Sequence, residues 1–246
     1  MMQEYWELYM KPIDGHPATV SFNAGIAVEL RKEALPYMGF VKLTMNEPNE
    51  KGLISEAEAP QLQFVEDSIE AAVLRYKIGN YVGKIVTNAT ISFIFYLKYD
   101  FEWSDVVAYA FQKIDGYGYE FGSREDGAWE VYHKLLEPNT KQWQIIHNHN
   151  ACERLKAQGD TLEEVRAIEH KVYFKTLESI EAFICKAEEN GFTCNLALQD
   201  ERGEKVTFYR KDRPFYYDID DITLQLIDLA DQHGGIYDGW ECAVVK

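Results

Sequence analysis

The final third of the chain, residues 165–245, constrains the fold most, because its apolar residues change period several times along the sequence. Residues 165–174 alternate, which predicts a half-buried strand. Helical spacing follows and ends at Asn190-Gly191, a usual way for a helix to stop. Two alternating stretches, 192–199 and 205–209, flank a turn and predict a hairpin.

A second helical pattern opens with Asp218, Asp220 and Asp221 and runs to Gly234-Gly235. The octad that begins there, Gly-Gly-Ile-Tyr-Asp-Gly-Trp-Glu, predicts the end of the helix and then a bulge or turn at Asp238-Gly239. A final strand is expected at residues 242–245. The predicted order is strand, helix, strand, strand, helix, strand, which is the split βαβ order of ferredoxin-like domains.

The N-terminal half repeats this order after an opening hairpin. We expect strands at 6–10, 18–28, 39–45, 81–87, 90–97, 117–121 and 128–135, and helices at 60–76 and, with Ser104 as its N-cap, at 103–114. The sequence thus predicts an α+β protein with two ferredoxin-like antiparallel-sheet domains in tandem. The expected divisions are an α+β domain at 1–140, a connecting helix at 141–159 and a ferredoxin-like domain at 160–246.

Two stretches resemble known families. Glu169-His170, Tyr173-Phe174 and the octad resemble the regulator of ribonuclease E activity B family. This resemblance implies a ferredoxin-like protein that binds ribonuclease E, an RNA-degrading endonuclease, and restrains it without catalysis. The segment 126–132 and the aromatic strand at 91–96 resemble the domain of unknown function 695, which implies no known activity.

The charge of the chain favours a protein partner over nucleic acid. The formal net charge is -16, and residues 151–246 hold 12 basic and 20 acidic side chains, a net of -8 that equals the net of residues 1–150. Neither half has the basic field that neutralises phosphates, so no direct nucleic-acid ligand is expected. An acidic surface suits a basic partner such as ribonuclease E or a related RNA-processing protein.

Composition also bears on location and cofactors. Residues 1–10 lack the pattern of a secretory signal, and the most apolar run, 91–97, is too short to span a bilayer. The four cysteines show no metal or redox spacing. We therefore expect a cytoplasmic protein with no membrane partner and no cofactor.

Six residues form the predicted partner-binding set: Glu169, Tyr173, Tyr237, Asp238, Trp240 and Glu241. Two interpretations of the octad stay open. In one, its glycines cap the helix, Tyr237 and Trp240 pack, and Asp238 bonds a turn. In the other, Tyr237, Asp238 and Glu241 form a binding rim.

Two other functions compete with this one. A metal-dependent hydrolase would use His133, His147, His149 or the 218–221 cluster. However, His147 and His149 are two apart on a helix and point away from each other, and the aspartates suit capping of a helix. RNA could bind an open sheet face through Tyr173 and Tyr209, although Glu169 and Glu241 would repel phosphates. His170 lies on the apolar side of its strand, which favours a core histidine over a catalytic one. Because no catalytic motif occurs, we expect no catalytic or metal residues and no enzyme.

Overall fold

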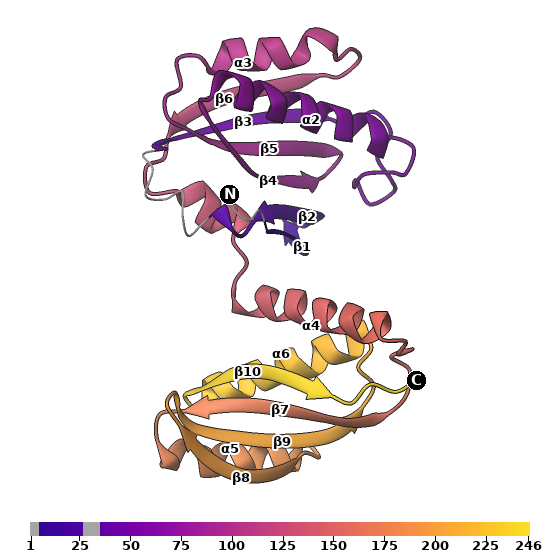
Figure 1. Cartoon of the computed structure of the whole chain (residues 1–246), viewed down its shortest axis with the longest axis vertical. Coiled ribbons are helices and arrows are strands. Elements are labelled where there is room, and N and C mark those ends of the chain that lie inside the picture. The colour runs from indigo at the N-terminus through magenta and orange to yellow at the C-terminus, as the bar shows by residue number, and fades with distance from the viewer. Residues whose placement is uncertain (1–4, 27–34) are drawn as a thin grey trace. The chain divides into compact units, whose positions relative to one another are not determined.

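The computed structural model describes residues 5–26 and 35–246, without the side chains of 177–178 and 196–200. The chain divides into two compact units, residues 1–137 and 138–246 (Figure 1). Each unit contains one antiparallel sheet with helices packed on it. The predicted α+β class with two antiparallel sheets is confirmed.

The first unit is built on a six-stranded sheet in the order β1-β2-β4-β5-β3-β6. The helices α2 and α3 pack against each other and cover one face of this sheet. Its elements are β1 (Trp6–Ile13), β2 (His16–Asn23), β3 (Tyr37–Thr44), α2 (Ala59–Tyr76), β4 (Gly79–Thr87), β5 (Thr90–Leu97), α3 (Trp103–Ala110), the 3₁₀ turn η2 (Phe111–Lys113), β6 (Tyr119–Glu125) and the π-helical turn η3 (Tyr132–Leu136).

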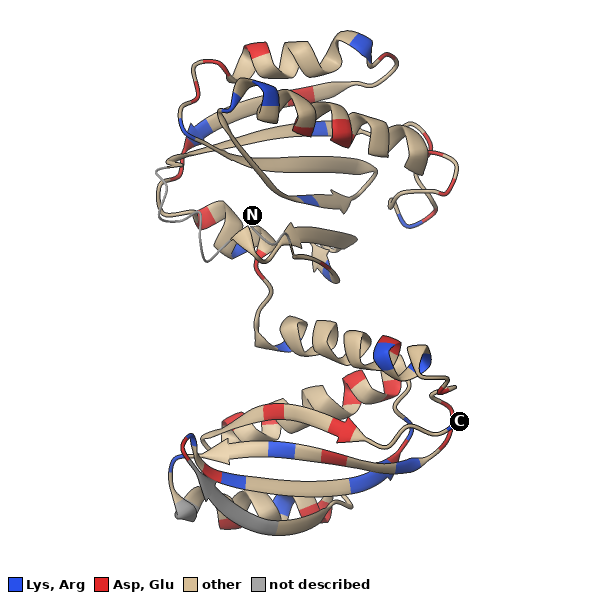
Figure 2. Ribbon diagram, in the orientation of Figure 1, with Lys and Arg blue, Asp and Glu red and all other residues tan. Residues whose placement is uncertain are grey.

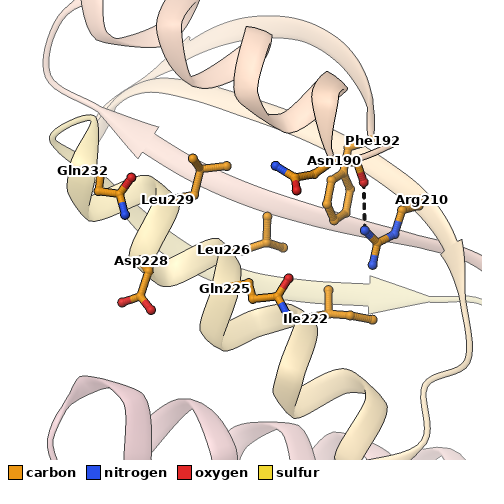
Figure 3. Close-up of a pocket in the computed structure, with 9 residues that line it drawn as sticks. All are labelled: Asn190, Phe192, Arg210, Ile222, Gln225, Leu226, Asp228, Leu229 and Gln232. Carbon is orange, nitrogen blue, oxygen red and sulfur yellow. Dashed lines mark hydrogen bonds between the residues drawn. The ribbon is translucent and has the colours of Figure 1, made fainter.

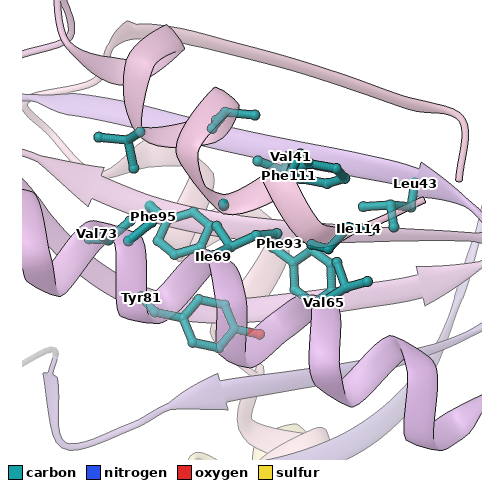
Figure 4. Close-up of a cluster of buried hydrophobic side chains, with 14 of the residues drawn as sticks. Val41, Leu43, Val65, Ile69, Val73, Tyr81, Phe93, Phe95, Phe111 and Ile114 are labelled. Atoms are coloured by element: carbon teal, nitrogen blue, oxygen red, sulfur yellow. The ribbon is translucent and has the colours of Figure 1, made fainter.

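The core of the first unit lies between this sheet and the two helices. The apolar stripe of α2, including Val65, Ile69 and Val73, is buried against Phe93 and Phe95 of β5 (Figure 4). The helical period of the sequence predicted this stripe, because residues three and four apart share one face of a helix. Burial of that face gives α2 most of its stability.

The second unit is built on a four-stranded sheet in the order β10-β7-β9-β8. Its core is formed by residues such as Val172, Phe174 and Phe208 of the sheet and Phe183 and Leu226 of the helices. The elements are α4 (Thr140–Ala157), β7 (Arg166–Phe174), α5 (Leu177–Glu189), β8 (Thr193–Asp200), β9 (Gly203–Asp212), α6 (Tyr216–Gln232) and β10 (Gly235–Cys242).

Both units share one strand order once the β1–β2 hairpin is set aside. In the first unit, β3 lies between β5 and β6. In the second unit, the corresponding strand β7 lies between β9 and β10. The name ferredoxin-like stays an interpretation of this order. The helix expected at 141–159 is α4, which lies in the second unit and packs on α6.

Several local predictions were wrong. Residues 128–135 do not form a strand, because the Asp126 carboxylate accepts hydrogen bonds from the amides of Glu130 and Val131 and starts a helical turn. Ser104 is not an N-cap, since α3 begins one residue before it. Residues 27–28 of the predicted hairpin lie outside the described residues.

The closing strand is β10, Gly235–Cys242, so it contains most of the octad, and residues 243–245 of the expected strand lie outside it. β10 pairs with β7 from Gly235 to Cys242, and its register shifts between Tyr237 and Gly239. The predicted bulge is therefore present. It breaks the alternation of side chains, which is why the octad does not show the period of a strand.

Candidate functional site

The pairing of β10 with β7 decides which face of the second sheet each octad residue occupies. Tyr237 lies opposite Val172, and Trp240 lies opposite His170. Residues three apart in a regular strand face opposite ways, but the bulge turns both of these side chains to the face that α5 and α6 cover. Both pack against the clusters of buried residues on that face.

The other face, which we call the open face, carries the remaining predicted residues. Glu241 lies opposite Glu169, and Ile236 lies opposite Tyr173. Since residues directly opposite in an antiparallel pair share a face, these two pairs lie on the same face, four residues apart along β7. Tyr209 of β9 lies opposite Glu169 and joins them.

Arg202, in the turn between β8 and β9, joins Tyr173 to Asp238. Its guanidinium lies 4.0 Å from the centre of the Tyr173 ring, and its Nη2 donates a hydrogen bond to the Tyr173 hydroxyl. Nη1 donates to Asp238 Oδ1 at 2.8 Å, and Nη2 donates to Oδ2 at 3.2 Å. The structure thus brings Glu169, Tyr173, Asp238 and Glu241 to one face and separates Tyr237 and Trp240 from them.

The open face carries both signs of charge. Lys171 Nζ lies 2.8 Å from Glu241 Oε2, and the Glu241 side chain is 64% exposed. Asp238 is paired with Arg202. Glu169 makes no ion pair with any residue in the described part of the chain. Figure 2 shows basic residues along β7 and β9 and acidic residues on α6.

The aromatic residues of the open face are poorly placed for stacking on RNA bases. Arg202 covers the Tyr173 ring, and Tyr209 has Glu169 as its cross-strand neighbour. An RNA base needs an uncovered ring and a face that tolerates its phosphate. The geometry therefore favours a protein partner over RNA.

Beneath the open face, His170 and Tyr237 form a buried neutral pair. His170 is fully buried, and its Nδ1 lies 2.8 Å from the Tyr237 hydroxyl. Burial, followed by the charge of Arg210, lowers the pKa of His170 to about 3. Burial also raises the pKa of Tyr237 well above its usual value. His170 is thus the core histidine that its strand position predicted.

Trp240 belongs to a buried polar cluster centred on Asn148 of α4. Asn148 Oδ1 accepts hydrogen bonds from Trp240 Nε1 and Gln144 Nε2, each at 2.8 Å. Asn148 Nδ2 donates to Asp220 Oδ1 at 2.8 Å and to Thr223 Oγ1 at 2.7 Å. This cluster, which the sequence did not indicate, ties β10 to α4 and α6.

The aspartates at the start of α6 do not cap it as we expected. α6 begins at Tyr216, its N-cap is Phe215, and no side chain caps its first turn. Asp218 lies in that turn and pairs with Arg213 at 2.6 Å. Asp220 instead turns toward α4, where its Oδ2 lies 2.9 Å from His149 Nε2, and burial raises its pKa.

The histidines proposed for a metal site each contact a different residue. His133 pairs with Glu137, whereas His147 lies beside the Trp143 ring at 5.6 Å. Among the residues that the structure describes, no group of three or more His, Cys, Asp or Glu side chains could hold a metal ion. The metal-dependent hydrolase hypothesis gains no support from this geometry.

A small hollow lies on the helix-covered side of the second unit (Figure 3). Its volume is about 260 Å³. Arg210 lies over the Phe192 ring at 4.3 Å and donates from Nη1 to the Asn190 carbonyl at 2.9 Å. The lining comes from several elements: Asn190, Phe192, Arg210, Ile222, Gln225, Leu226, Asp228, Leu229 and Gln232.

None of the helices in the described ranges is both long and apolar enough to cross a bilayer.

Comparison with known proteins follows the division into two units. A model described as a family of unknown function, DUF695, matches residues 4–137, and a model described as Regulator of ribonuclease activity B matches residues 145–242. No curated protein matches the chain. A solved structure titled as an unknown protein from Galdieria sulphuraria is 9% identical, with 85% of this chain and 99% of that chain covered and a TM-score of 0.22. A likeness at that score carries no argument.

The DUF695 match spans more than half of the 246 residues, and both matches agree with the resemblances found in the sequence. The Regulator of ribonuclease activity B match contains the open face and the His170–Tyr237 pair beneath it. The chain therefore belongs to the family of unknown function DUF695, whose model matches residues 4–137, and its residues 145–242 match the model described as Regulator of ribonuclease activity B.

Proposed function

We propose that the second unit binds an RNA-degrading endonuclease of the ribonuclease E type in the cytoplasm and restrains it without catalysis. The observation that carries the proposal is the convergence of Glu169, Tyr173, Asp238 and Glu241 on the open face. The Regulator of ribonuclease activity B match supports the regulatory class.

The open face suits a partner that is basic and carries an exposed segment. Glu169 is a carboxylate that no described residue neutralises. Among the described residues Glu241 pairs with Lys171, and the Glu241 side chain is 64% exposed. An ion pair between solvent-exposed side chains contributes about 0–1 kcal/mol. A lysine or arginine of the partner can therefore replace Lys171 at little cost. In this proposal Glu169 and Glu241 form the acidic centre of the interface.

Tyr237 and Trp240 have a supporting role in the proposal. Their polar groups bond to His170 and Asn148 on the helix-covered face, which holds the bulge of β10 in place. Ile236 next to them is 65% exposed on the open face. An exposed apolar side chain on this face can contact a partner and lose its exposed surface when the partner binds.

The test is inhibition of ribonuclease E cleavage of a fluorescent RNA oligonucleotide by the full chain. We expect Glu169→Gln with Glu241→Gln to weaken inhibition by about tenfold or more, because two charged contacts are lost. Glu188→Gln with Glu189→Gln is the matched control, since both residues are exposed on α5.

The control should inhibit as the unchanged protein does. Equal inhibition by both double variants, with both folded, would show that the open face is not the interface. Absence of inhibition and of binding by the unchanged protein would contradict the proposed partner.

A further inference from the structure

A cavity of about 430 Å³ lies in the first unit, on the face of the sheet that α2 and α3 leave uncovered. Its floor comes from β3, β4, β5 and β6, which Figure 1 labels. The lining from outside these strands is both polar and apolar: Asp14, His16, Asn88, Ile13, Val131 and Leu135. This volume lies within the range of about 300–1,000 Å³ that is usual for small-molecule pockets.

The strand pairing places polar side chains at one end of the cavity floor and apolar side chains in its middle. Thr87 lies opposite Thr90 at one end, and in the next row Ser92 lies opposite Lys42. The row after that pairs Ile94 with Phe40. Met38 follows on β3 and lies opposite Arg124 of β6, which also lines the cavity. The cavity therefore has hydroxyl groups and an ammonium at one end and an apolar middle.

Gly122 helps to keep this middle open. A Cβ at Gly122 would lie 2.9 Å from Phe40 Cε1. Without that atom the Phe40 ring can lie against β6, where Gly122 is its cross-strand neighbour. Any side chain at residue 122 would push the ring away from β6.

Lys42 is able to bind a further acceptor at the polar end. Its Nζ lies 3.2 Å from Glu120 Oε1, and both side chains are exposed, at 41% and 65%. An ammonium has three donors, so this one ion pair leaves capacity for a ligand. A second hollow, of about 300 Å³, shares Lys42 and Thr90 with the polar end of this cavity. Ser92 makes no hydrogen bond through its side chain to any described residue.

We propose that this cavity binds a small amphipathic anion. Its apolar body would lie against Phe40 and Ile94, and its carboxylate or similar head group would accept hydrogen bonds from Lys42 and Ser92. A cationic ligand would meet the Lys42 ammonium, and a fully polar ligand would lose its hydration against the apolar floor. This site lies wholly in the first unit and does not depend on the function proposed for the second.

The test is a titration of the full chain with octanoate, 1-octanol and octylammonium, followed by NMR and calorimetry. We expect saturable octanoate binding with shifts at the amides of Thr90 and Ser92. The neutral alcohol, which lacks the charged hydrogen bonds, should bind about tenfold or more weakly. Absence of saturable octanoate binding, or equal or tighter binding of octylammonium, would overturn the proposal.

Two variants at the polar end should act in opposite directions. Lys42→Gln should weaken octanoate binding by about tenfold, whereas Glu120→Gln should tighten it, because it frees the ammonium. Lys134→Gln is the matched control, since Lys134 is exposed and does not line the cavity. If Lys42→Gln bound octanoate as the control does, or Glu120→Gln weakened binding, the assignment of the head group to Lys42 would be wrong.

Discussion

Replacement of Asn148 by alanine tests the buried cluster that holds β10. Asn148 is fully buried and makes four hydrogen bonds through its side chain. In the variant, Trp240 Nε1 and Gln144 Nε2 lose the acceptor that the structure gives them, and Asp220 loses a donor but keeps His149. An orphaned buried donor costs about 1–3 kcal/mol and a lost bond to a charged group about 1.5–3 kcal/mol. Because Trp240 is only partly buried, the sum of the three lies near its lower end, roughly 4 kcal/mol.

Native-state amide hydrogen exchange of the full chain measures this loss. The free energy of opening should fall by that amount for the amides of α4, α6 and β10. The amides of α2 in the first unit serve as an internal reference. His147→Ala is the control on the same helix, because His147 is exposed, and a surface substitution of this kind changes stability by about 0.5 kcal/mol or less.

A loss below about 1 kcal/mol for Asn148→Ala would refute the reasoning, since such a value is smaller than that of a single orphaned buried donor. A loss equal to that of His147→Ala would do the same. Either result would mean that the hydrogen bonds of the cluster do not stabilise the second unit.

Three further predictions concern single residues. Burial and Arg210 lower the pKa of His170 to about 3, whereas an unfolded histidine titrates near 6.5, so the unfolded state binds the proton first as pH falls. His170 should therefore contribute a loss of about 1.4 kcal/mol of stability per pH unit from about pH 6.5 to 3 in denaturation of the second unit. His170→Gln should reduce the slope by that amount, and an unchanged slope would contradict the prediction. Gly235→Ala would place a Cβ 2.5 Å from Phe174 Cε1 and should lower the free energy of unfolding by about 1–3 kcal/mol. Thermal unfolding measures this loss, and an unchanged melting temperature would refute the contact. Asp126→Ala removes the acceptor of the Tyr96 hydroxyl at 2.6 Å and of two amides, and should cost roughly 3 kcal/mol in urea unfolding of the first unit; a cost near zero would count against this role.

The elements whose apolar residues repeat at a regular spacing were predictable from the sequence. The helix expected at 60–76 is α2, and the strand expected at 165–174 is β7, because in each one face is buried and the other is not. Burial of one face imposes the period that the sequence shows. The order of strands and helices was predicted for the same reason, except that the strand expected at 128–135 of the first unit is absent.

Elements shaped by polar contacts were harder to predict. The bulge in β10 breaks the alternation of the octad, and the Asp126 carboxylate turns residues after it into helix instead of strand. α4 was predicted as a helix, but its packing on α6 was not. Its buried residues include Gln144 and Asn148, so no apolar stripe marks the packed face.

The sequence named candidate residues for the proposed interface but did not show their arrangement. Alternation placed Glu169 and Tyr173 on one side of β7, away from His170. The contacts of Arg202 with Tyr173 and Asp238 join residues far apart in the sequence, and no local pattern reports them. The division of the octad between two faces depends on the bulge, whose register only the structure gives.

The central claim is that the open face contacts the ribonuclease, and side-chain oxidation footprinting of the complex tests it most directly. Ile236, 65% exposed on the open face, and Tyr209 beside Glu169 are the reporters. Tyr217, 76% exposed on α6, is the internal control. We predict that ribonuclease E protects Ile236 and Tyr209 from oxidation and leaves Tyr217 unchanged. Protection of Tyr217 with no change at Ile236 and Tyr209 would contradict the claim and place the partner on the helices.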